Sequence, residues 1–184
     1  MREGRAVVRA WRIPKPTVLV DTRERQPYCL AEMHPNWIGG VKQATLKAGD
    51  YSVEGMESVL ALERKSMADA IGSAVALANR ARFIRSCARL AEYRWKAILI
   101  EATYEQMKSF YPNQDEDLCT EAHPNAVCGT YDAIEAKFGI PIIYTSRDRR
   151  LATERAASWL SKHFTYWWLE QNGHGRMLID TDGI

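Results

Sequence analysis

The sequence lacks any apolar run long enough to cross a membrane. Its longest nearly uncharged apolar stretch is residues 71–78, whereas a membrane-spanning helix needs about 20 apolar residues. The first residues carry charges of both signs with no apolar run behind them, so no signal peptide is predicted. We therefore expect no membrane as a partner and a cytoplasmic or nuclear location.

Cysteine is scarce and unpaired. The four cysteines, Cys29, Cys87, Cys119 and Cys128, form no CxxC motif and are predicted to be reduced thiols. Cys119, His123 and Cys128 match the spacing of no common zinc module and have no evident fourth ligand, which disfavours a zinc site. Internal repeats and low-complexity segments are also absent from the sequence.

A strong net charge is missing as well, because 25 basic residues nearly balance 23 acidic ones and leave a formal charge of +2. The charges are nevertheless segregated: residues 2–15 and 80–96 are basic, and residues 101–121 are acidic. Local basic faces of this kind can hold a phosphate backbone. The alternative is that they are ordinary solvated helix faces.

The 184 residues, with 46% hydrophobic and 26% charged side chains, are typical of one soluble globular domain. We predict a basic arm over residues 1–16, a folded domain over 17–170 and a tail over 171–184. Apolar runs and turn residues predict strands over 17–20, 44–47, 50–54, 58–64, 97–100 and 141–144. Helices are expected over 66–93 with a break near Asn79, over 103–110, over 124–138 with Gly139 as its cap, and over 148–170; residues 22–43 are predicted to be irregular with one short helix.

Strands that alternate with helices predict an α/β fold, with a central mixed β-sheet that contains an antiparallel hairpin and is flanked by helices. In the last helix, the spacing of Trp159, Leu160 and Phe164 favours a core position. The adjacent Trp167 and Trp168 cannot both face the core, so we expect one of them to be exposed at an interface.

The apolar pattern sets the register of the predicted hairpin. If residues 55–58 form the loop, Tyr51 faces Leu62 and Val53 faces Leu60, which gathers these four apolar side chains on one face. A shift of one residue would pair apolar with polar side chains, so this register is favoured.

The same register places Asp50 opposite Glu63 on the other face of the hairpin, with Lys65 beside them and Arg64 pointing away. Facing carboxylates repel, so they favour a cation between them. Magnesium takes carboxylate oxygens, can polarise a phosphate and lowers the pKa of a bound water, while a lysine can orient that water or stabilise developing charge. The alternative is a solvated edge hairpin in which Lys65 simply pairs with one of the acids.

Gly49-Asp50-Tyr51, followed by Glu63-Arg64-Lys65-Ser66 and Asp69, resembles the GDxnERKxxxD signature of the XPF/MUS-type nucleases. These belong to the restriction-endonuclease-like PD-(D/E)xK superfamily. Val20-Asp21-Thr22-Arg23-Glu24 resembles the end of the family's first strand, and further similarity brings the covered region to residues 17–162.

The resemblance implies a restriction-endonuclease-like core and a Mg²⁺-dependent DNA endonuclease, with Mn²⁺ as a substitute metal. It implies catalytic roles for Asp21, Asp50, Glu63 and Lys65, of which Asp21, Asp50 and Glu63 would bind the metal. The supporting residues would be Arg23, Glu24, Arg64, Asp69 and Arg82, and we expect DNA contacts from Arg64, Arg80, Arg82 and Arg85.

Two departures limit what the resemblance implies. Ser86 stands where many family members have Gln or Glu, and the chain leaves no room for the tandem helix-hairpin-helix module of the larger members. We expect a small stand-alone member of phage or bacterial type that binds DNA through the nuclease domain, the basic arm or an accessory subunit, and that forms a homodimer if it follows its relatives. Branched, flap or junction DNA is the expected substrate; the alternatives are a catalytically silent scaffold and a sequence-specific restriction-type nuclease.

Overall fold

The computed structural model describes residues 13–111 and 122–174 and shows a six-stranded mixed sheet in the order β2-β1-β3-β4-β5-β6. The strands are β1 (Thr17–Asp21), β2 (Gly40–Ala44), β3 (Tyr51–Val53), β4 (Leu60–Ser66), β5 (Trp95–Glu101) and β6 (Ile142–Tyr144). The helices are α2 (Leu30–Met33), α3 (Met67–Val75), α4 (Leu77–Ala91), α5 (Tyr104–Lys108), α6 (Pro124–Phe138) and α7 (Arg149–Gln171). The predicted α/β class and mixed sheet are confirmed.

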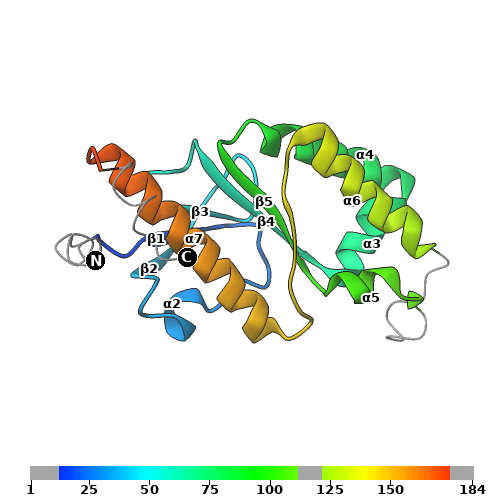
Figure 1. Ribbon diagram of the computed structural model, residues 1–184, viewed down its shortest axis with the longest axis horizontal. Helices are drawn as coiled ribbons and strands as arrows, with labels where there is room; N and C mark the ends of the chain where they lie inside the picture. The colour runs from blue at the N-terminus through cyan, green and yellow to red at the C-terminus, as the bar shows by residue number, and fades with distance from the viewer. Residues whose placement is uncertain (1–12, 112–121, 175–184) are drawn as a thin grey trace, which may run out of the picture.

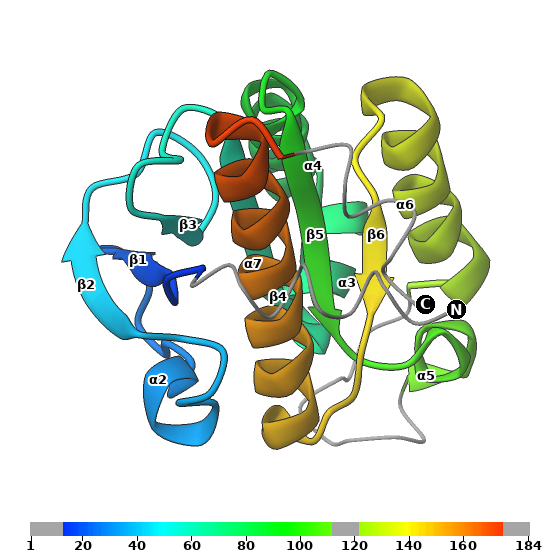
Figure 2. The same cartoon turned by 60° about the vertical axis from the view of Figure 1, so that its left-hand side comes forward.

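Helices cover both faces of the sheet: α3, α4, α5 and α6 pack on one face, and α2 and α7 on the other (Figures 1 and 2). Strand β5 divides its side chains between the two cores because successive strand residues point to opposite faces. Ile98 and Ile100 join the core under α3–α6, whereas Ala97 and Leu99 join the core under α7. Both faces of the central strands are therefore buried.

Strand direction brings the polar strand ends to one edge of the sheet. β1 is antiparallel to β3, and β3 is antiparallel to β4, so β1 and β4 run the same way; β5 and β6 are parallel to β4. The carboxyl ends of these four strands, together with residue 50 just before β3, thus lie at a single edge. We call it the site edge; it carries Asp21, Asp50, Ser66, Glu101 and Tyr144.

The strand predicted over 44–47 is wrong, because β2 forms earlier, over Gly40–Ala44. It pairs with β1 in parallel, from Thr17 opposite Gly40 to Asp21 opposite Ala44, so it ends where β1 ends. This edge strand gave no hydrophobic signal, because its sequence, Gly-Val-Lys-Gln-Ala, holds only one large apolar side chain. The chain then leaves the sheet and returns at β3.

The helix predicted over 66–93 forms two helices that meet at Ala76, whose extended backbone (φ −73°, ψ 116°) interrupts the hydrogen-bond ladder. Ser66, where the predicted helix begins, is the N-cap of α3, since its hydroxyl accepts the Asp69 N–H at 3.1 Å. Gly139 caps α6 in the left-handed conformation (φ 60°), which is also confirmed.

In α7, Trp159, Leu160 and Phe164 are buried as predicted. The expectation that Trp167 or Trp168 is exposed is wrong, because both are partly buried against the core. Cys29, Cys87 and Cys128 are free thiols, as predicted, while Cys119 and most of the acidic stretch lie outside the described residues. None of the helices in the described ranges has the length and apolarity to cross a membrane.

Candidate active site

Asp50 is fixed at the site edge by three hydrogen bonds. Its N–H donates to the Leu62 carbonyl at 2.9 Å, and its own carbonyl accepts the Asp21 N–H at 2.8 Å. One carboxylate oxygen accepts the Arg64 N–H at 2.7 Å. The chain around Asp50 is thereby held to β1 on one side and to β4 on the other.

Gly49 makes this close approach feasible. It has a φ of 74°, and a Cβ placed on it would lie 3.0 Å from the Leu62 carbonyl oxygen. Any other residue would combine a strained left-handed backbone with a backbone collision. Glycine at this position is therefore required by the approach of the chain to β4.

We expect Gly49→Ala to destabilise the fold by about 3 kcal/mol, from about 1–2 kcal/mol of left-handed strain plus overpacking. Gly139→Ala is the matched control: it has a φ of 60°, but nothing lies within 4 Å of a Cβ placed there. It should lose the strain energy only. Urea unfolding of both variants measures the difference, and equal losses would show that the contact with Leu62 carries no cost.

The predicted register of the hairpin is confirmed at its one recorded pair, Tyr51 opposite Leu62. Tyr51, Val53, Leu60 and Leu62 all lie in the core under α7, as the apolar pattern predicts. The alternative of a solvated edge hairpin is wrong, because β3 and β4 are the two central strands of the sheet.

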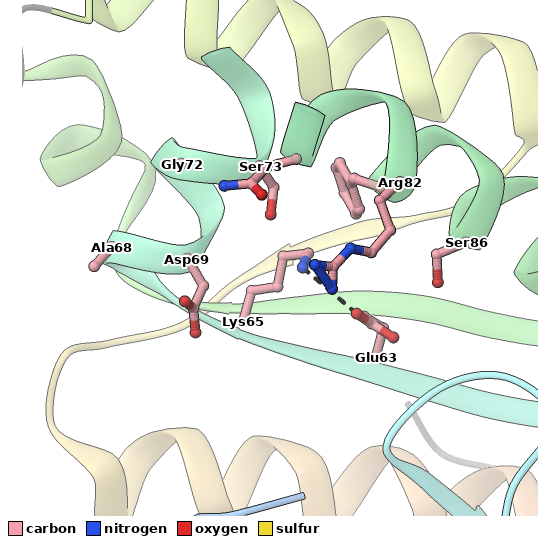
Figure 3. A pocket seen from close by; sticks show the side chains of 10 residues that line it. Glu63, Lys65, Ala68, Asp69, Gly72, Ser73, Arg82 and Ser86 are labelled. Atoms are coloured by element: carbon pink, nitrogen blue, oxygen red, sulfur yellow. Dashed lines mark ion pairs between the residues drawn. The ribbon is translucent and has the colours of Figure 1, made fainter. Parts of the chain in front are cut away.

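Glu63 and Lys65 extend from the other face of β4 into a pocket of about 340 Å³ under α3 and α4 (Figure 3). Their side chains are only 18% and 11% exposed, and the Lys65 Nζ lies 3.5 Å from a Glu63 carboxylate oxygen. The same ammonium lies 4.5 Å from the centre of the Phe83 ring. Asp69, Arg82 and Ser86 also line the pocket.

The two acids of the hairpin interact electrostatically. Burial, and then the negative charge of Glu63, raise the pKa of Asp50 from 3.8 to about 7, although the Arg64 N–H and the Lys65 charge favour the ionised form. Two half-buried carboxylates of like charge form a donor set that fits a divalent cation, because the ion would relieve their repulsion. Asp50 and Glu63 are the residues that would hold it.

Asp21 lies at the same edge, but its carboxylate is already bound. Its oxygens accept the Arg23 guanidinium at 2.6 and 2.8 Å and the Leu46 N–H at 2.8 Å. The hydrogen bond from Arg23 lowers the pKa of Asp21 to about 2. Over residues 13–111 and 122–174, no three His, Cys, Asp or Glu side chains are grouped to hold a metal. In this arrangement the Asp21 oxygens are engaged by Arg23 and Leu46, and its expected role as a third metal ligand stays a prediction.

Arg64 points away from the pocket, as predicted, and enters a buried cluster of charges. Its guanidinium donates to both carboxylate oxygens of Glu101 at 2.9 and 3.1 Å and to Glu24 at 3.3 Å. The three side chains are between 7% and 10% exposed. A direct DNA contact by Arg64 is therefore not supported, since its donors are used inside the protein; its place is that of a supporting residue.

Arg149, at the start of α7, completes this cluster. It donates to Glu101 at 3.5 Å and to the Gln26 and Pro27 carbonyls, and it lies 5.1 Å from the centre of the Tyr28 ring. No role was predicted for Arg149 from the sequence. The available signal was position, because Glu101 ends β5 and Arg149 follows β6, and parallel neighbours end at the same edge.

The arginines predicted on α4 differ in their surroundings. Arg80 donates to the Ala74 carbonyl and to the Thr130 hydroxyl, both at 2.7 Å, and so ties α4 to α3 and α6. Arg85 is exposed on the helix surface. Arg82 is exposed and lines the pocket beside Glu63 and Lys65. The structure thus brings Arg82 to the site and assigns Arg80 a structural contact.

Comparison with protein families matches residues 20–153 to the ERCC4 domain. None of the curated protein sequences compared with this chain matches it. Among solved structures, the chain is similar to XPF from Aeropyrum pernix, with a TM-score of 0.57 and 18% identity over 91% of this chain and 82% of that one. It is also similar to XPF from Aeropyrum pernix in complex with DNA, with a TM-score of 0.57 and 21% identity over 81% of this chain and 64% of that one.

At these identities the solved structures show a shared fold, which confirms the restriction-endonuclease-like core expected from the XPF/MUS-type resemblance. The family match spans the strand of Asp21, the Gly49-Asp50 turn, the Glu63-Arg64-Lys65 strand and α4. It covers well over half of the sequence. The chain therefore belongs to the ERCC4 domain family.

Proposed function

We propose that this protein is a metal-dependent DNA endonuclease. The observation that carries the proposal is the Glu63 carboxylate beside the Lys65 ammonium in a polar pocket under α3 and α4. Asp50, just before β3, is close enough for the negative charge of Glu63 to raise its pKa. A solvated ion pair would not raise the pKa of Asp50, whereas burial and the negative charge of Glu63 do. Membership of the ERCC4 domain family supports a nuclease role.

In this proposal Asp50 and Glu63 bind Mg²⁺, with Mn²⁺ as a substitute. A bound divalent cation would polarise the scissile phosphate and lower the pKa of the attacking water. Lys65 orients that water or stabilises the charge that develops on the phosphate, and Arg82 holds a phosphate oxygen from α4. Asp21 and Arg23 keep the end of β1 in place against Asp50.

The proposed substrate is DNA with a branch, flap or junction, cut by a folded domain that spans residues 17–170. The similar structure of XPF from Aeropyrum pernix in complex with DNA supports a nucleic acid as the partner. We further propose that the protein binds DNA as a homodimer or with an accessory DNA-binding subunit. The homodimer is the simpler of the two arrangements.

We expect the protein to cut flap, fork or Holliday-junction DNA in Mg²⁺ and to leave it intact in EDTA. Lys65→Ala should slow cleavage at saturating DNA by about a hundredfold, the scale of losing one group that stabilises transition-state charge. Lys47→Ala is the control, since Lys47 is an exposed lysine outside the pocket.

Cleavage in EDTA, or full activity of Lys65→Ala, would contradict the mechanism. Binding of DNA without cleavage in any metal would instead favour a catalytically silent scaffold. Preferential cutting of one sequence in linear duplex DNA would favour a restriction-type nuclease over a structure-specific one.

A further inference from the structure

A group of arginines lies at the site edge on the α7 side of the sheet. We call it the arginine patch; it consists of Arg23, Arg25, Arg147, Arg149 and Arg150. Two separate segments contribute, the loop after β1 and the start of α7. They are in direct contact, because the Arg149 guanidinium donates to the Gln26 and Pro27 carbonyls.

The patch presents positive charge to solvent while its carboxylate neighbours face inward. The side chains of Arg23, Arg149 and Arg150 are 69%, 41% and 80% exposed, and Arg25 and Arg147 are exposed as well. By contrast, the carboxylates of Asp21, Glu24 and Glu101 lie beneath the surface, at 10% exposure or less. Asp148, in contrast, is 37% exposed and pairs with Arg150 at 2.8 Å.

The patch is continuous with the catalytic acids. Arg23 sits on Asp21, whose N–H binds the Asp50 carbonyl, and the charges of Asp21, Asp50 and Glu63 all raise the pKa of Arg23. Arg82, on α4 at the opposite face of the sheet, lines the same pocket as Glu63. Basic side chains therefore lie near the proposed site on both faces of the sheet.

We propose that the arginine patch is a second DNA-binding surface, which holds the phosphate backbone of the DNA arm on the α7 side of the scissile phosphate. The identity of the partner rests on the proposed nuclease function; the surface itself rests on exposed guanidiniums above buried carboxylates. Arginine suits this role because its planar fork binds phosphate oxygens in pairs. With Arg82 on the other side, the edge of the sheet holds two DNA segments that diverge around the acids.

The test compares two triple variants of equal charge in the full chain. The patch variant is Arg25→Gln, Arg147→Gln and Arg150→Gln, none of which belongs to the proposed catalytic machinery. The control variant is Arg89→Gln, Lys137→Gln and Lys162→Gln, three exposed basic residues outside the patch. Fluorescence anisotropy with a labelled flap DNA in EDTA, over a range of salt concentrations, measures binding apart from cleavage.

The patch variant should bind the flap at least about tenfold more weakly near 0.1 M salt, with a slope of log K against log salt that is smaller by about 2–3, because each lost phosphate contact removes about 0.9. The control should keep the wild-type slope. In Mg²⁺ the patch variant should cut as fast as wild type once DNA is saturating.

If the two triple variants weaken flap DNA binding equally, or if the patch variant keeps the wild-type slope of log K against log salt, the arginine patch is not a DNA-binding surface. If the patch variant binds flap DNA more weakly as expected but the wild type never cuts it, the nuclease proposal fails and the DNA-binding surface is supported. If the wild type cuts flap DNA but the patch variant keeps the wild-type salt slope, the nuclease proposal is supported and the DNA-binding surface fails.

Discussion

Asp50→Asn is expected to remove cleavage and to stabilise the protein. Without one of the two proposed metal-binding carboxylates, cleavage at saturating DNA should fall by on the order of a thousandfold. The asparagine oxygen can still accept the Arg64 N–H that Asp50 accepts at 2.7 Å, so the local hydrogen bond survives. Asp132→Asn, which removes an exposed carboxylate on α6, is the control and should cut normally.

The stabilisation follows from the raised pKa of Asp50. Its folded-state pKa is about 7 against an ordinary 3.8, so the folded protein holds this proton more tightly than the unfolded chain. The associated stability is fully present below pH 3.8 and is lost as the pH rises through 7. A tenfold change in proton affinity corresponds to 1.36 kcal/mol, so Asp50→Asn should gain on the order of 2–4 kcal/mol above pH 7.

Urea unfolding in EDTA between pH 4 and pH 8 measures this gain. The difference between Asp50→Asn and the wild type should grow with pH up to about 7 and then level off. Added Mg²⁺ should raise the stability of the wild type at pH 8, because a ligand of the folded state stabilises it, and should do little for the variant. A difference that does not change with pH would contradict the raised pKa of Asp50.

Among substitutions that remove a charge from the site, Arg64→Ala is expected to destabilise the protein most. It leaves Glu24 and Glu101 buried without their main partner, and breaking a buried ion pair in this way costs about 3–5 kcal/mol. The loss is comparable with the whole stability of many domains. Arg64→Lys keeps the positive charge but loses the paired hydrogen bonds to Glu101, so it should fold and lose less.

Arg94→Ala is a matched control for Arg64. Arg94 also donates two hydrogen bonds to one carboxylate, that of Glu170, at 2.7 and 2.8 Å. Its side chain is 56% exposed, however, so its removal should cost less than about 1 kcal/mol. Urea unfolding compares the variants; a similar loss for Arg64→Ala and Arg94→Ala would mean that burial of the cluster adds nothing.

Much of the site was predictable because it is local in the sequence. The alternation of apolar residues fixed Tyr51 opposite Leu62, and the same alternation put Glu63 and Lys65 on one face and Arg64 on the other. Helix ends marked by Ser66 and Gly139 were predictable for a similar reason, since each cap depends on its immediate neighbours.

The remaining features depend on contacts between distant segments. β2 is held by pairing with β1 rather than by an apolar pattern of its own, so its position was missed. The hydrogen bond from the Leu46 N–H to Asp21 joins segments that are distant in the sequence. Glu101 likewise accepts hydrogen bonds from Arg64 and Arg149 because of which strands end side by side. Residue patterns along one strand carry no information about such meetings.

The cluster of Glu24, Arg64, Glu101 and Arg149 contains two negative and two positive charges. Three of the four side chains are buried, and in such a set with no net charge a change at one member leaves an opposite charge without compensation. Substitutions that persist should therefore come in pairs. Among related sequences, loss of the arginine on α7 should accompany loss of one of the two glutamates, so that the four positions covary as one unit. The proposed catalytic residues Asp50, Glu63 and Lys65 should stay constant.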